Sequence, residues 1–528
     1  MVGNRPHVAF AVSCAIACAC AVAAPPQDPP GIETLQQQMA AGALDARALT
    51  REARARIDAL DRSGPALHAV IELNPDADAI AARLDAERRH GRLRGPLHGI
   101  PVLLKDNIDT GDRMQTTAGS LALVGAPAPR DAGVAARLRA AGAVILGKTN
   151  LSEWSNFRSD RSTSGWSGRG GLTRNPYALD RNACGSSSGS AVAVAAGYVP
   201  AAVGTETDGS IVCPAAVNGI VGIKPTVGLV SRAGIVPISR SQDTAGAMAR
   251  SVQEAALLLS AIAGSDPRDP STAEADAHAT DYTRFLDAGA LRGKRIGVVR
   301  ALAGADPRVG EVLERSIAAL RAAGAEVVDD VELPHLDALG KAEMTLLRYE
   351  FKADLGAYLA TRRGVPVRSI ADLVEWNRAH ADRELQWFGQ DRLEDALKRG
   401  SLADPAYRDA LEKARRMAGP EGIDAALAAH RLDALMAPTV GPAWTTDLVN
   451  GDHVDGGSST PAAVAGYPDI TVPAGLVHGL PVGISFFAGK WSEPRLLGIA
   501  YAFEQATRAR RAPTLAAHVE GDPAAGTP

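Results

Sequence analysis

The sequence predicts an α/β protein built on a mixed β-sheet. Two stretches far apart in the chain, 102–146 and 295–333, each alternate a strand pattern, a helix pattern and a second strand pattern. A strand–helix–strand unit normally joins two parallel strands of one sheet. Hydrophobic residues make up 46% of the 528 residues but aromatic residues only 4%, so the core must consist mainly of Ala, Val, Leu and Ile.

The first half of the chain alternates helices and strands. In the segment 33–61, Leu49, Ala53 and Ile57 fall on one helical face, Asp45 is placed to cap this helix, and Gly42 separates it from an earlier one. The remaining expectations are a helix over 78–89, a strand over 99–104, a helix over 131–141, a strand over 144–146, a helix over 191–196, a strand over 219–224 and a helix over 252–263.

The segment 155–183 shows neither the helical nor the strand periodicity of apolar residues and is rich in Ser, Gly, Arg and Asn. A loop of this length in a compact protein is usually functional or disordered, and we expect it to form an ordered wall beside the site. Trp444 and Tyr467 are further candidates for such a wall.

The second half begins with a connection over 264–290. A helical insert follows around 341–430, in which Met344, Leu347 and Phe351 share one face that we interpret as core packing. The other expected elements are strands over 295–299 and 326–333, a helix over 309–323, strands over 435–437, 470–472 and 482–486, and a helix over 501–508. We expect residues 24–528 to form a single domain.

Residues 1–23 read as a secretory signal peptide. Arg5 precedes the apolar run 8–22, and Ala21-Val22-Ala23 fits a cleavage site of small residues. No other stretch is long and apolar enough for a membrane span. The expected protein is therefore exported, and either periplasmic or secreted.

Cleavage after Ala23 leaves two cysteines, Cys184 and Cys213. An oxidising compartment permits a bridge, but a bridge needs Cα atoms within about 7 Å of each other. We expect two free, buried thiols.

Charge and histidine pattern limit the possible partners. A net charge of −4 offers no basic surface for nucleic acid, and the eleven histidines show no metal-ligand spacing. We expect no nucleic-acid partner, no metal and no cofactor, and a monomer is plausible.

The stretch from Cys184 to Cys213 organises the rest of the chain. It begins with a loop of small residues, G-S-S-S-G-S, continues as a short Ala/Val helix, and ends in a second tight loop over 204–210, with Asp208-Gly209 as its turn signal. A flexible linker does not fit, because linkers do not carry an apolar run that must be buried. We expect two serine-bearing loops that fold back on each other.

These residues resemble the serine- and glycine-rich signature of the amidase signature family. G-S-S-S-G-S-A is followed by G-T-E-T-D-G-S-I, and the resemblance extends to G-I-P-V-L-L-K-D-N, N-G-I-V-G-I-K-P-T, S-Q-D-T-A-G and A-G-Y-P-D-I-T-V-P. It covers roughly residues 30–510. It implies one large mixed β-sheet covered by α-helices on both sides. Within this family, the segment T-E-T-D-G-S-I-V-C-P most resembles the peptide amidases, which remove the C-terminal amide of peptides.

The resemblance implies a Ser-Ser-Lys triad, with Ser210 as nucleophile, Ser186 as bridging serine and Lys105 as base. It also implies a cis peptide bond at Gly185–Ser186. A lysine can act as base when burial lowers its pKa. The expected oxyanion hole consists of backbone N–H groups of Thr207, Asp208, Gly209 and Ser210.

Two departures from the family pattern bear on the substrate. Asp208 stands where the family commonly has glycine, and its carboxylate can bind the substrate backbone. Val212 stands where many members have an arginine, which is a natural partner for a substrate carboxylate. We expect a neutral peptide or small-molecule amide as substrate.

Other interpretations remain. G-S-S-S-G also satisfies the G-x-S-x-G nucleophile elbow of esterases, which would make Ser187 the nucleophile. Three alternatives concern the function: a broad-specificity amidase for small aliphatic or aryl amides, one component of a tRNA-dependent amidotransferase, and a non-catalytic ligand-binding protein on an amidase scaffold.

Overall fold

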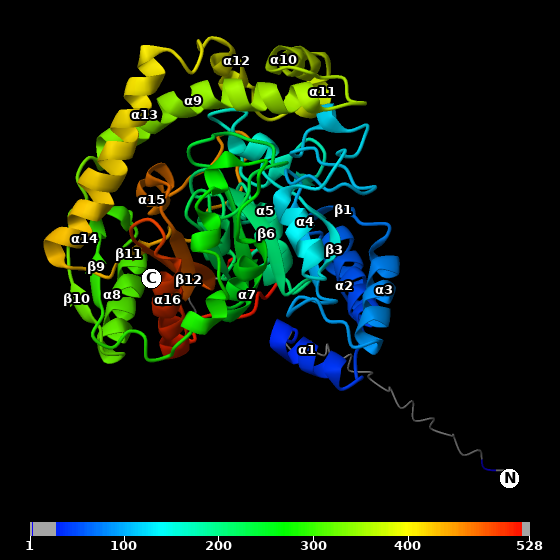
Figure 1. Ribbon diagram of the computed structural model, residues 1–528, viewed down its shortest axis with the longest axis horizontal. Helices are drawn as coiled ribbons and strands as arrows, with labels where there is room; N and C mark the ends of the chain where they lie inside the picture. The colour runs from blue at the N-terminus through cyan, green and yellow to red at the C-terminus, as the bar shows by residue number, and fades with distance from the viewer. Residues whose placement is uncertain (1–2, 4–27, 520–528) are drawn as a thin grey trace.

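The computed structural model describes residue 3 and residues 28–519. Apart from residue 3, the expected signal peptide lies outside the described residues. Within them, eleven strands form one mixed sheet in the order β1-β3-β2-β6-β8-β7-β12-β13-β11-β9-β10, flanked by helices as Figure 1 shows.

The strands of this sheet are β1 (Val70–Leu73), β2 (Pro101–Lys105), β3 (Val144–Thr149), β6 (Ala201–Glu206), β7 (Val221–Lys224), β8 (Thr244–Ala249), β9 (Arg295–Val298), β10 (Glu326–Val328), β11 (Ala434–Pro438), β12 (Asp469–Val477) and β13 (Leu480–Phe487). A separate pair of two-residue strands, β4 (Trp166–Ser167) and β5 (Gly171–Leu172), lies in the long loop expected over 155–183.

The sheet has two parallel regions separated by an antiparallel middle, and its edge strand β1 pairs antiparallel with β3. β2 runs parallel to β3 and β6 at one end, and β9 runs parallel to β10 and β11 at the other. Both predicted strand–helix–strand units are therefore confirmed, and each joins two parallel neighbours. The strands between them, from β6 through β8, β7, β12 and β13 to β11, pair antiparallel.

The helices of the first half are α1 (Ile32–Ala40), α2 (Ala46–Ile57), α3 (Ala77–Arg89), α4 (Gly133–Ala140), α5 (Ser188–Ala195), α6 (Val212–Val217) and α7 (Val252–Ile262). Those of the second half are α8 (Pro307–Ala322), α9 (Leu336–Thr361), α10 (Ile370–Ala379), α11 (Ala381–Glu384), α12 (Asp391–Leu397), α13 (Pro405–Ala418), α14 (Asp424–His430), α15 (Ser459–Ala465) and α16 (Glu493–Thr507). The expected cap of α2 is present, since the Asp45 side chain accepts a hydrogen bond from the Ala48 N–H.

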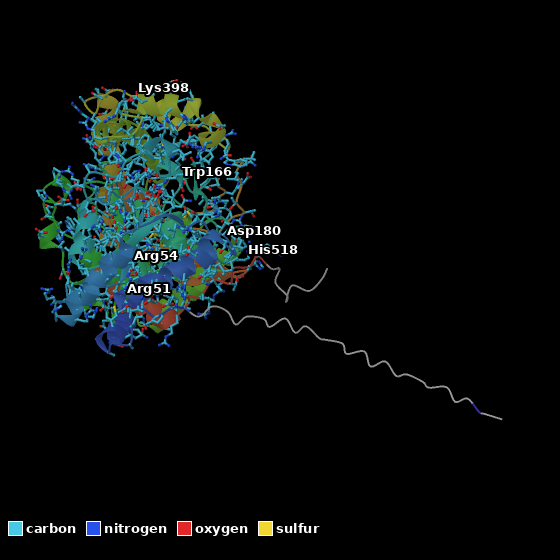
Figure 2. All side chains as sticks on the ribbon, turned by 90° about the vertical axis from the view of Figure 1, so that its right-hand side faces the viewer. Arg51, Arg54, Trp166, Asp180, Lys398 and His518 are labelled. Atoms are coloured by element: carbon cyan, nitrogen blue, oxygen red, sulfur yellow. A yellow bond between two sulfur atoms is a disulfide. The ribbon has the colours of Figure 1, made fainter. Side chains whose placement is uncertain are left out.

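The helices of the predicted insert form a separate layer over one edge of the sheet. Figure 1 shows α9 running across the top of the molecule, with α10, α11 and α12 beside it and α13 descending toward α14. In the view turned by 90°, Lys398 marks this layer at the top and Arg51 and Arg54 of α2 lie at the opposite end (Figure 2). The loops that follow β2, β6 and β7 lie beneath α9.

Strands β6 and β8 were not predicted from the sequence. Their sequences, A-A-V-G-T-E and T-A-G-A-M-A, lack the alternation that usually marks a strand and are dominated by Ala and Gly rather than by β-branched or aromatic residues. Both are buried along their whole length at the centre of the sheet, where small side chains let helices pack closely. Over residue 3 and residues 28–519, no helix is long and apolar enough to cross a membrane.

Candidate active site

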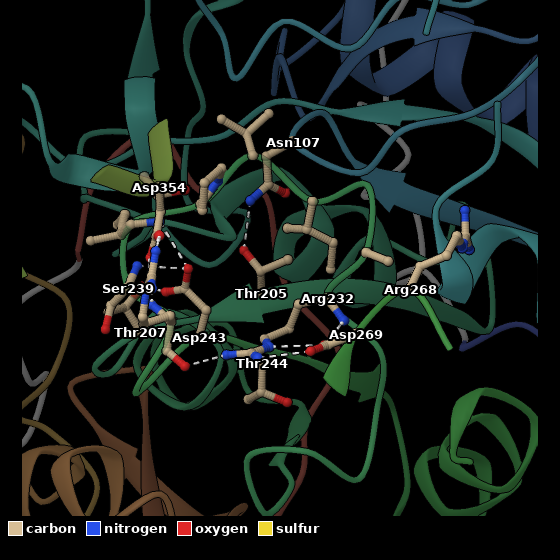
Figure 3. Close-up of a pocket in the computed structure, with 17 residues that line it drawn as sticks. Asn107, Thr205, Thr207, Arg232, Ser239, Asp243, Thr244, Arg268, Asp269 and Asp354 are labelled. Atoms are coloured by element: carbon tan, nitrogen blue, oxygen red, sulfur yellow. Dashed lines mark hydrogen bonds and ion pairs between the residues drawn. The ribbon is translucent and has the colours of Figure 1, made fainter. Parts of the chain in front are cut away.

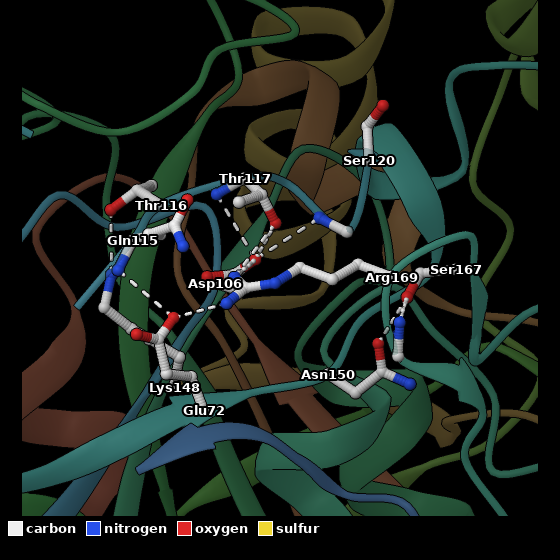
Figure 4. Close-up of polar contacts among 12 residues, drawn as sticks. Glu72, Asp106, Gln115, Thr116, Thr117, Ser120, Lys148, Asn150, Ser167 and Arg169 are labelled. Carbon is white, nitrogen blue, oxygen red and sulfur yellow. Dashed lines mark hydrogen bonds and ion pairs between the residues drawn. The ribbon is translucent and has the colours of Figure 1, made fainter. Parts of the chain in front are cut away.

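A buried polar network fixes the end of strand β2, where Lys105 lies. The carboxylate of the next residue, Asp106, accepts hydrogen bonds from the Thr117 and Gly119 N–H groups and lies 3.5 Å from the guanidinium of Arg169 (Figure 4). This network holds the chain as it leaves the sheet, so the position of the Lys105 side chain is set by the strand and by Asp106 together.

The amine of Lys105 is fully buried against two hydroxyl groups and one carbonyl. Its Nζ lies 2.7 Å from Ser186 Oγ, 2.9 Å from Thr205 Oγ1 and 3.2 Å from the Thr205 carbonyl oxygen. Burial lowers the pKa of Lys105 to about 7, and the carboxylates of Asp243 and Glu206 oppose part of that shift. Near neutral pH, a substantial fraction of this lysine is therefore an uncharged amine.

Two other lysines are equally buried, and their contacts differ. Lys148 Nζ donates to the Ile108 carbonyl at 2.6 Å and to Thr116 Oγ1 at 2.8 Å, and Lys224 Nζ donates to the Pro225 carbonyl at 3.1 Å. Neither contacts a serine hydroxyl in the described part of the chain, whereas Lys105 contacts Ser186. Burial is therefore common to the three lysines, and the contact with a serine hydroxyl distinguishes Lys105 from the other two.

The two serine-bearing loops fold back on each other, as the sequence predicts. The Ser187 N–H donates to the Ser210 carbonyl at 3.1 Å, and the expected cis peptide at Gly185–Ser186 is present. A Cβ at position 185 would lie 2.1 Å from Ser152 Oγ, so a larger residue there would have to displace the Ser152 side chain. The two loops thus bring the Ser186 hydroxyl to the lysine and Ser210 to the neighbouring cavity.

A disulfide joins Cys184 to Cys213, so the prediction of free thiols is wrong. The Cα atoms lie 6.1 Å apart, within the range that a bridge requires. The error has a physical cause, because the closeness of the two loops depends on contacts between Ser187 and Ser210 that the sequence does not show. The bridge ties the residue before Gly185-Ser186 to the helix that follows Ser210.

The loop that carries Ser210 is held from its carboxyl side by Glu206. Glu206 Oε2 accepts hydrogen bonds from the Ile211 N–H at 2.6 Å and the Val212 N–H at 3.0 Å. Gly209 has φ +74°, a left-handed conformation that suits glycine. Among the described residues, no protein acceptor hydrogen-bonds the backbone N–H groups of the preceding tight turn, namely Thr207, Asp208, Gly209 and Ser210.

A cavity of about 210 Å³ opens beside Ser210. Its polar wall includes Asp208 and Glu343, with Arg392 at the rim, and its apolar wall includes Met344 and Leu347. The interpretation of Met344 and Leu347 as core packing is therefore incomplete, since both also face this cavity. The expected wall from the long loop is present in part, as residues 155–157 line the cavity, while Trp444 and Tyr467 are not among its lining residues.

Ser187, the alternative nucleophile, has no access to this cavity. Its side chain is fully buried, and its hydroxyl donates to the Thr205 carbonyl at 3.0 Å. Ser210 is 7% exposed and lines the cavity. The geometry favours Ser210 over the esterase-type elbow.

A second cavity, of about 180 Å³, is lined by Asn107, Thr205 and Thr207 (Figure 3). Asp243 is central to it: one carboxylate oxygen accepts from Thr207 Oγ1 at 2.6 Å, and the other from the Ile238 and Ser239 N–H groups at 2.8 Å each. Burial raises the pKa of Asp243 to about 6 despite these hydrogen bonds. Across this cavity, Asn107 Nδ2 donates to Thr205 Oγ1 at 2.9 Å.

Sequence reasoning missed the residues that support this arrangement. Glu206, Gln242 and Asp243 lie within stretches that resemble the family signature, so their motif was visible although their roles were not. Glu343 had no comparable signal, because it lies in the helical insert and reaches the site only through the fold.

Comparisons with known proteins agree with this architecture. The family model Amidase matches residues 48–497. A probable amidase of Arabidopsis thaliana is 43% identical over 467 residues, which cover 87% of this chain and 86% of the relative. A glutamyl-tRNA(Gln) amidotransferase component of Pseudomonas syringae pv. syringae is 35% identical over 471 residues, covering 87% and 93%.

Solved structures of peptide amidase are similar over almost the whole fold. Native peptide amidase from Stenotrophomonas maltophilia superposes with a TM-score of 0.88 at 59% identity, covering 92% of this chain and 98% of that one. A peptide amidase in complex with the competitive inhibitor chymostatin gives a TM-score of 0.89 at the same identity and coverage.

The fold and these similarities define a hydrolase that acts on amides. The chain belongs to the amidase family, whose members carry the amidase signature.

Proposed function

We propose that this enzyme removes the C-terminal amide of peptides, giving a free acid and ammonia, through an acyl-enzyme on Ser210. The observation that carries the proposal is the buried contact of 2.7 Å between Lys105 Nζ and Ser186 Oγ. The next residue, Ser187, donates its N–H to the Ser210 carbonyl, so this contact lies close to Ser210. The similarity to peptide amidase structures supports the choice of substrate.

The contacts of Lys105 suit a neutral amine that accepts a proton. A neutral amine has two N–H donors and one lone pair, and Thr205 supplies two acceptors, its carbonyl and its Oγ1. The lone pair is then left for the Ser186 hydroxyl. Ser186 can pass the proton of Ser210 to Lys105 as Ser210 attacks the amide carbonyl.

The return of that proton completes the reaction. Lys105, now charged, gives its proton through Ser186 to the departing nitrogen, and ammonia leaves. Water then attacks the acyl-Ser210 ester by the same relay. The N–H groups of the turn 207–210 can bind the oxyanion, since no protein acceptor in the described residues occupies them.

The charges around the cavity favour a neutral peptide amide over an acidic substrate. Val212 is fully buried and offers no cation where many family members have an arginine. Arg392 reaches the cavity, but its Nε donates to Asp160 at 2.6 Å. Asp208 Oδ2 accepts from Thr460 Oγ1 at 2.6 Å, and a carboxylate has about four lone-pair sites, so Asp208 keeps acceptor capacity for a substrate backbone N–H besides its contacts within the protein.

We also propose that the protein is exported. The apolar run 8–22 supports this, and so does the Cys184–Cys213 disulfide, because such bonds persist in oxidising compartments. Intact-mass analysis of protein recovered from a secreting host should give a chain that begins at Ala24. A cytosolic protein that retains residues 1–23 would contradict this proposal.

The substrate assignment is tested by ammonia release from three groups of compounds: amidated peptides, free amino-acid amides and aryl amides. We expect the highest kcat/KM for amidated peptides and no release in Ser210→Ala. Turnover confined to aliphatic or aryl amides would support a broad-specificity amidase instead. No turnover of any amide, with a retained affinity for amidated peptides, would support the binding-protein alternative.

A further inference from the structure

Acidic side chains on one face of helix α9 accept hydrogen bonds from the segment 239–243. Glu343, Glu350 and Asp354 are spaced by seven and four residues, which places them on one side of the helix. Glu350 accepts from the Ser241 hydroxyl at 2.9 Å, and Asp354 accepts from the Arg240 N–H at 3.0 Å. The helical layer is thus bonded to a segment that itself contacts the nucleophile loop.

Segment 239–243 in turn forms hydrogen bonds with Thr207. The Asp243 carboxylate accepts from Thr207 Oγ1 at 2.6 Å, and Gln242 Nε2 donates to the Thr207 carbonyl at 3.3 Å. The same Gln242 Nε2 donates to Glu343 Oε1 at 2.7 Å. Gln242 therefore connects Glu343 to the first residue of the turn that precedes Ser210.

Glu343 also faces the cavity that the second residue of that turn, Asp208, lines. Glu343 and Asp208 line the same cavity, and burial together with the Asp208 carboxylate raises the pKa of Glu343 well above its ordinary value. The charged groups that face Glu343 are Asp208 and Arg392, and the Arg392 charge only partly offsets the shift. A buried carboxyl group beside a carboxylate ionises less readily, which favours the protonated form of Glu343.

We propose that Glu343 is a positioning residue for the nucleophile loop: in its protonated form it donates to the Asp208 carboxylate, and through Gln242 it fixes Thr207. The four N–H groups of the turn 207–210 then stay directed at the cavity. The proposal rests on the function proposed above, in which those N–H groups bind the oxyanion. It deepens that function by naming a residue from a distant helix that the reaction depends on.

Loss of the Glu343 proton should release the turn. With both carboxyl groups charged, Asp208 and Glu343 repel each other and the hydrogen bond between them is gone. The activity of the enzyme should therefore rise with pH as Lys105 becomes neutral, and fall again once Glu343 ionises. The ascending limb belongs to the base and the descending limb to the positioning pair.

The test compares Glu343→Gln, Glu343→Leu and the wild-type enzyme, with Glu375→Gln on the exposed side of α10 as the matched control. Glutamine keeps the shape, accepts from Gln242 and donates to Asp208 at every pH, whereas leucine does neither. At neutral pH we expect Glu343→Gln to retain kcat within a few-fold and Glu343→Leu to lose about ten- to a hundredfold in kcat, with KM little changed. The descending limb of the pH profile should disappear in Glu343→Gln and persist in Glu375→Gln.

Two results would overturn the proposal: an unchanged alkaline limb in Glu343→Gln, or no alkaline limb in the wild-type enzyme. Equal losses in Glu343→Gln and Glu343→Leu would do so too, since the conservative variant would then fail to rescue.

Thermal unfolding gives a second test that needs no turnover. A carboxyl group whose pKa is raised by folding stabilises the protein below its unfolded pKa and loses this contribution as pH rises through its folded pKa. The unfolding temperature of the wild-type protein should therefore fall, relative to Glu343→Gln, as pH rises above the ordinary range of a glutamate and through the raised folded pKa of Glu343. A constant difference would show that Glu343 carries no such proton, whatever the substrate of the enzyme is. An inactive protein with the expected difference would contradict the proposed function and, with it, the catalytic role of Glu343.

Discussion

Replacing Lys105 by arginine separates its charge from its basicity. With a pKa of about 7, the wild-type lysine is neutral in about half of the molecules at pH 7 and in about one hundredth at two pH units lower. The value of kcat/KM should therefore fall about tenfold for each pH unit below 7. Arginine stays charged at every accessible pH, so Lys105→Arg should lose about a hundredfold to ten-thousandfold in kcat/KM.

The assay is steady-state ammonia release from an amidated peptide between about pH 5 and pH 9, the range that brackets the pKa of the lysine. Lys398→Arg, on the surface of the helical layer, is the control and should match the wild-type profile. A flat wild-type profile below pH 7 would refute the assignment of Lys105 as base. So would a Lys105→Arg enzyme that keeps more than about a tenth of wild-type activity, because a permanent cation cannot accept the proton.

The same geometry leads to three other expected outcomes. Replacing both Cys184 and Cys213 by alanine opens a crosslink with a sequence separation of 29 residues, which should cost about 3–4 kcal/mol of stability; an unchanged urea midpoint would contradict this. Ser186→Ala should lower kcat by about a hundredfold or more, since the relay between nucleophile and base is broken; near-normal kcat would exclude a relay. Asp243→Asn removes a charge that raises the pKa of Lys105, so the acid limb of kcat/KM should move to lower pH, and an unmoved limb would exclude this coupling.

The outline of the fold could be predicted because the two strand–helix–strand units are encoded locally. The helices α2 and α8 carry apolar positions at helical spacing, and β2 and β3 contain the apolar runs V-L-L and V-I-L. The strands β6 and β8 are buried along their whole length too, but they consist largely of Ala and Gly, so they show neither an alternating pattern nor a run of large apolar residues.

The site residues likewise fall into those that sequence motifs predict and those that only the folded chain brings together. Lys105, Ser186 and Ser210 were identified from motifs, and the structure brings Lys105 and Ser186 together while Ser210 lines the adjoining cavity. The disulfide was missed because it depends on the distance between two loops. Glu343 was missed because its contact with the nucleophile loop exists only after the helical layer has folded over the sheet.

The most direct test of the proposed function is mass spectrometry of one amidated peptide with several internal peptide bonds, incubated with the purified enzyme. We expect conversion of the terminal amide to the acid with every internal bond intact, full loss of this activity in Ser210→Ala, and retention of it in Ser187→Ala. Internal cleavage products, or an active Ser210→Ala enzyme, would contradict the proposed function.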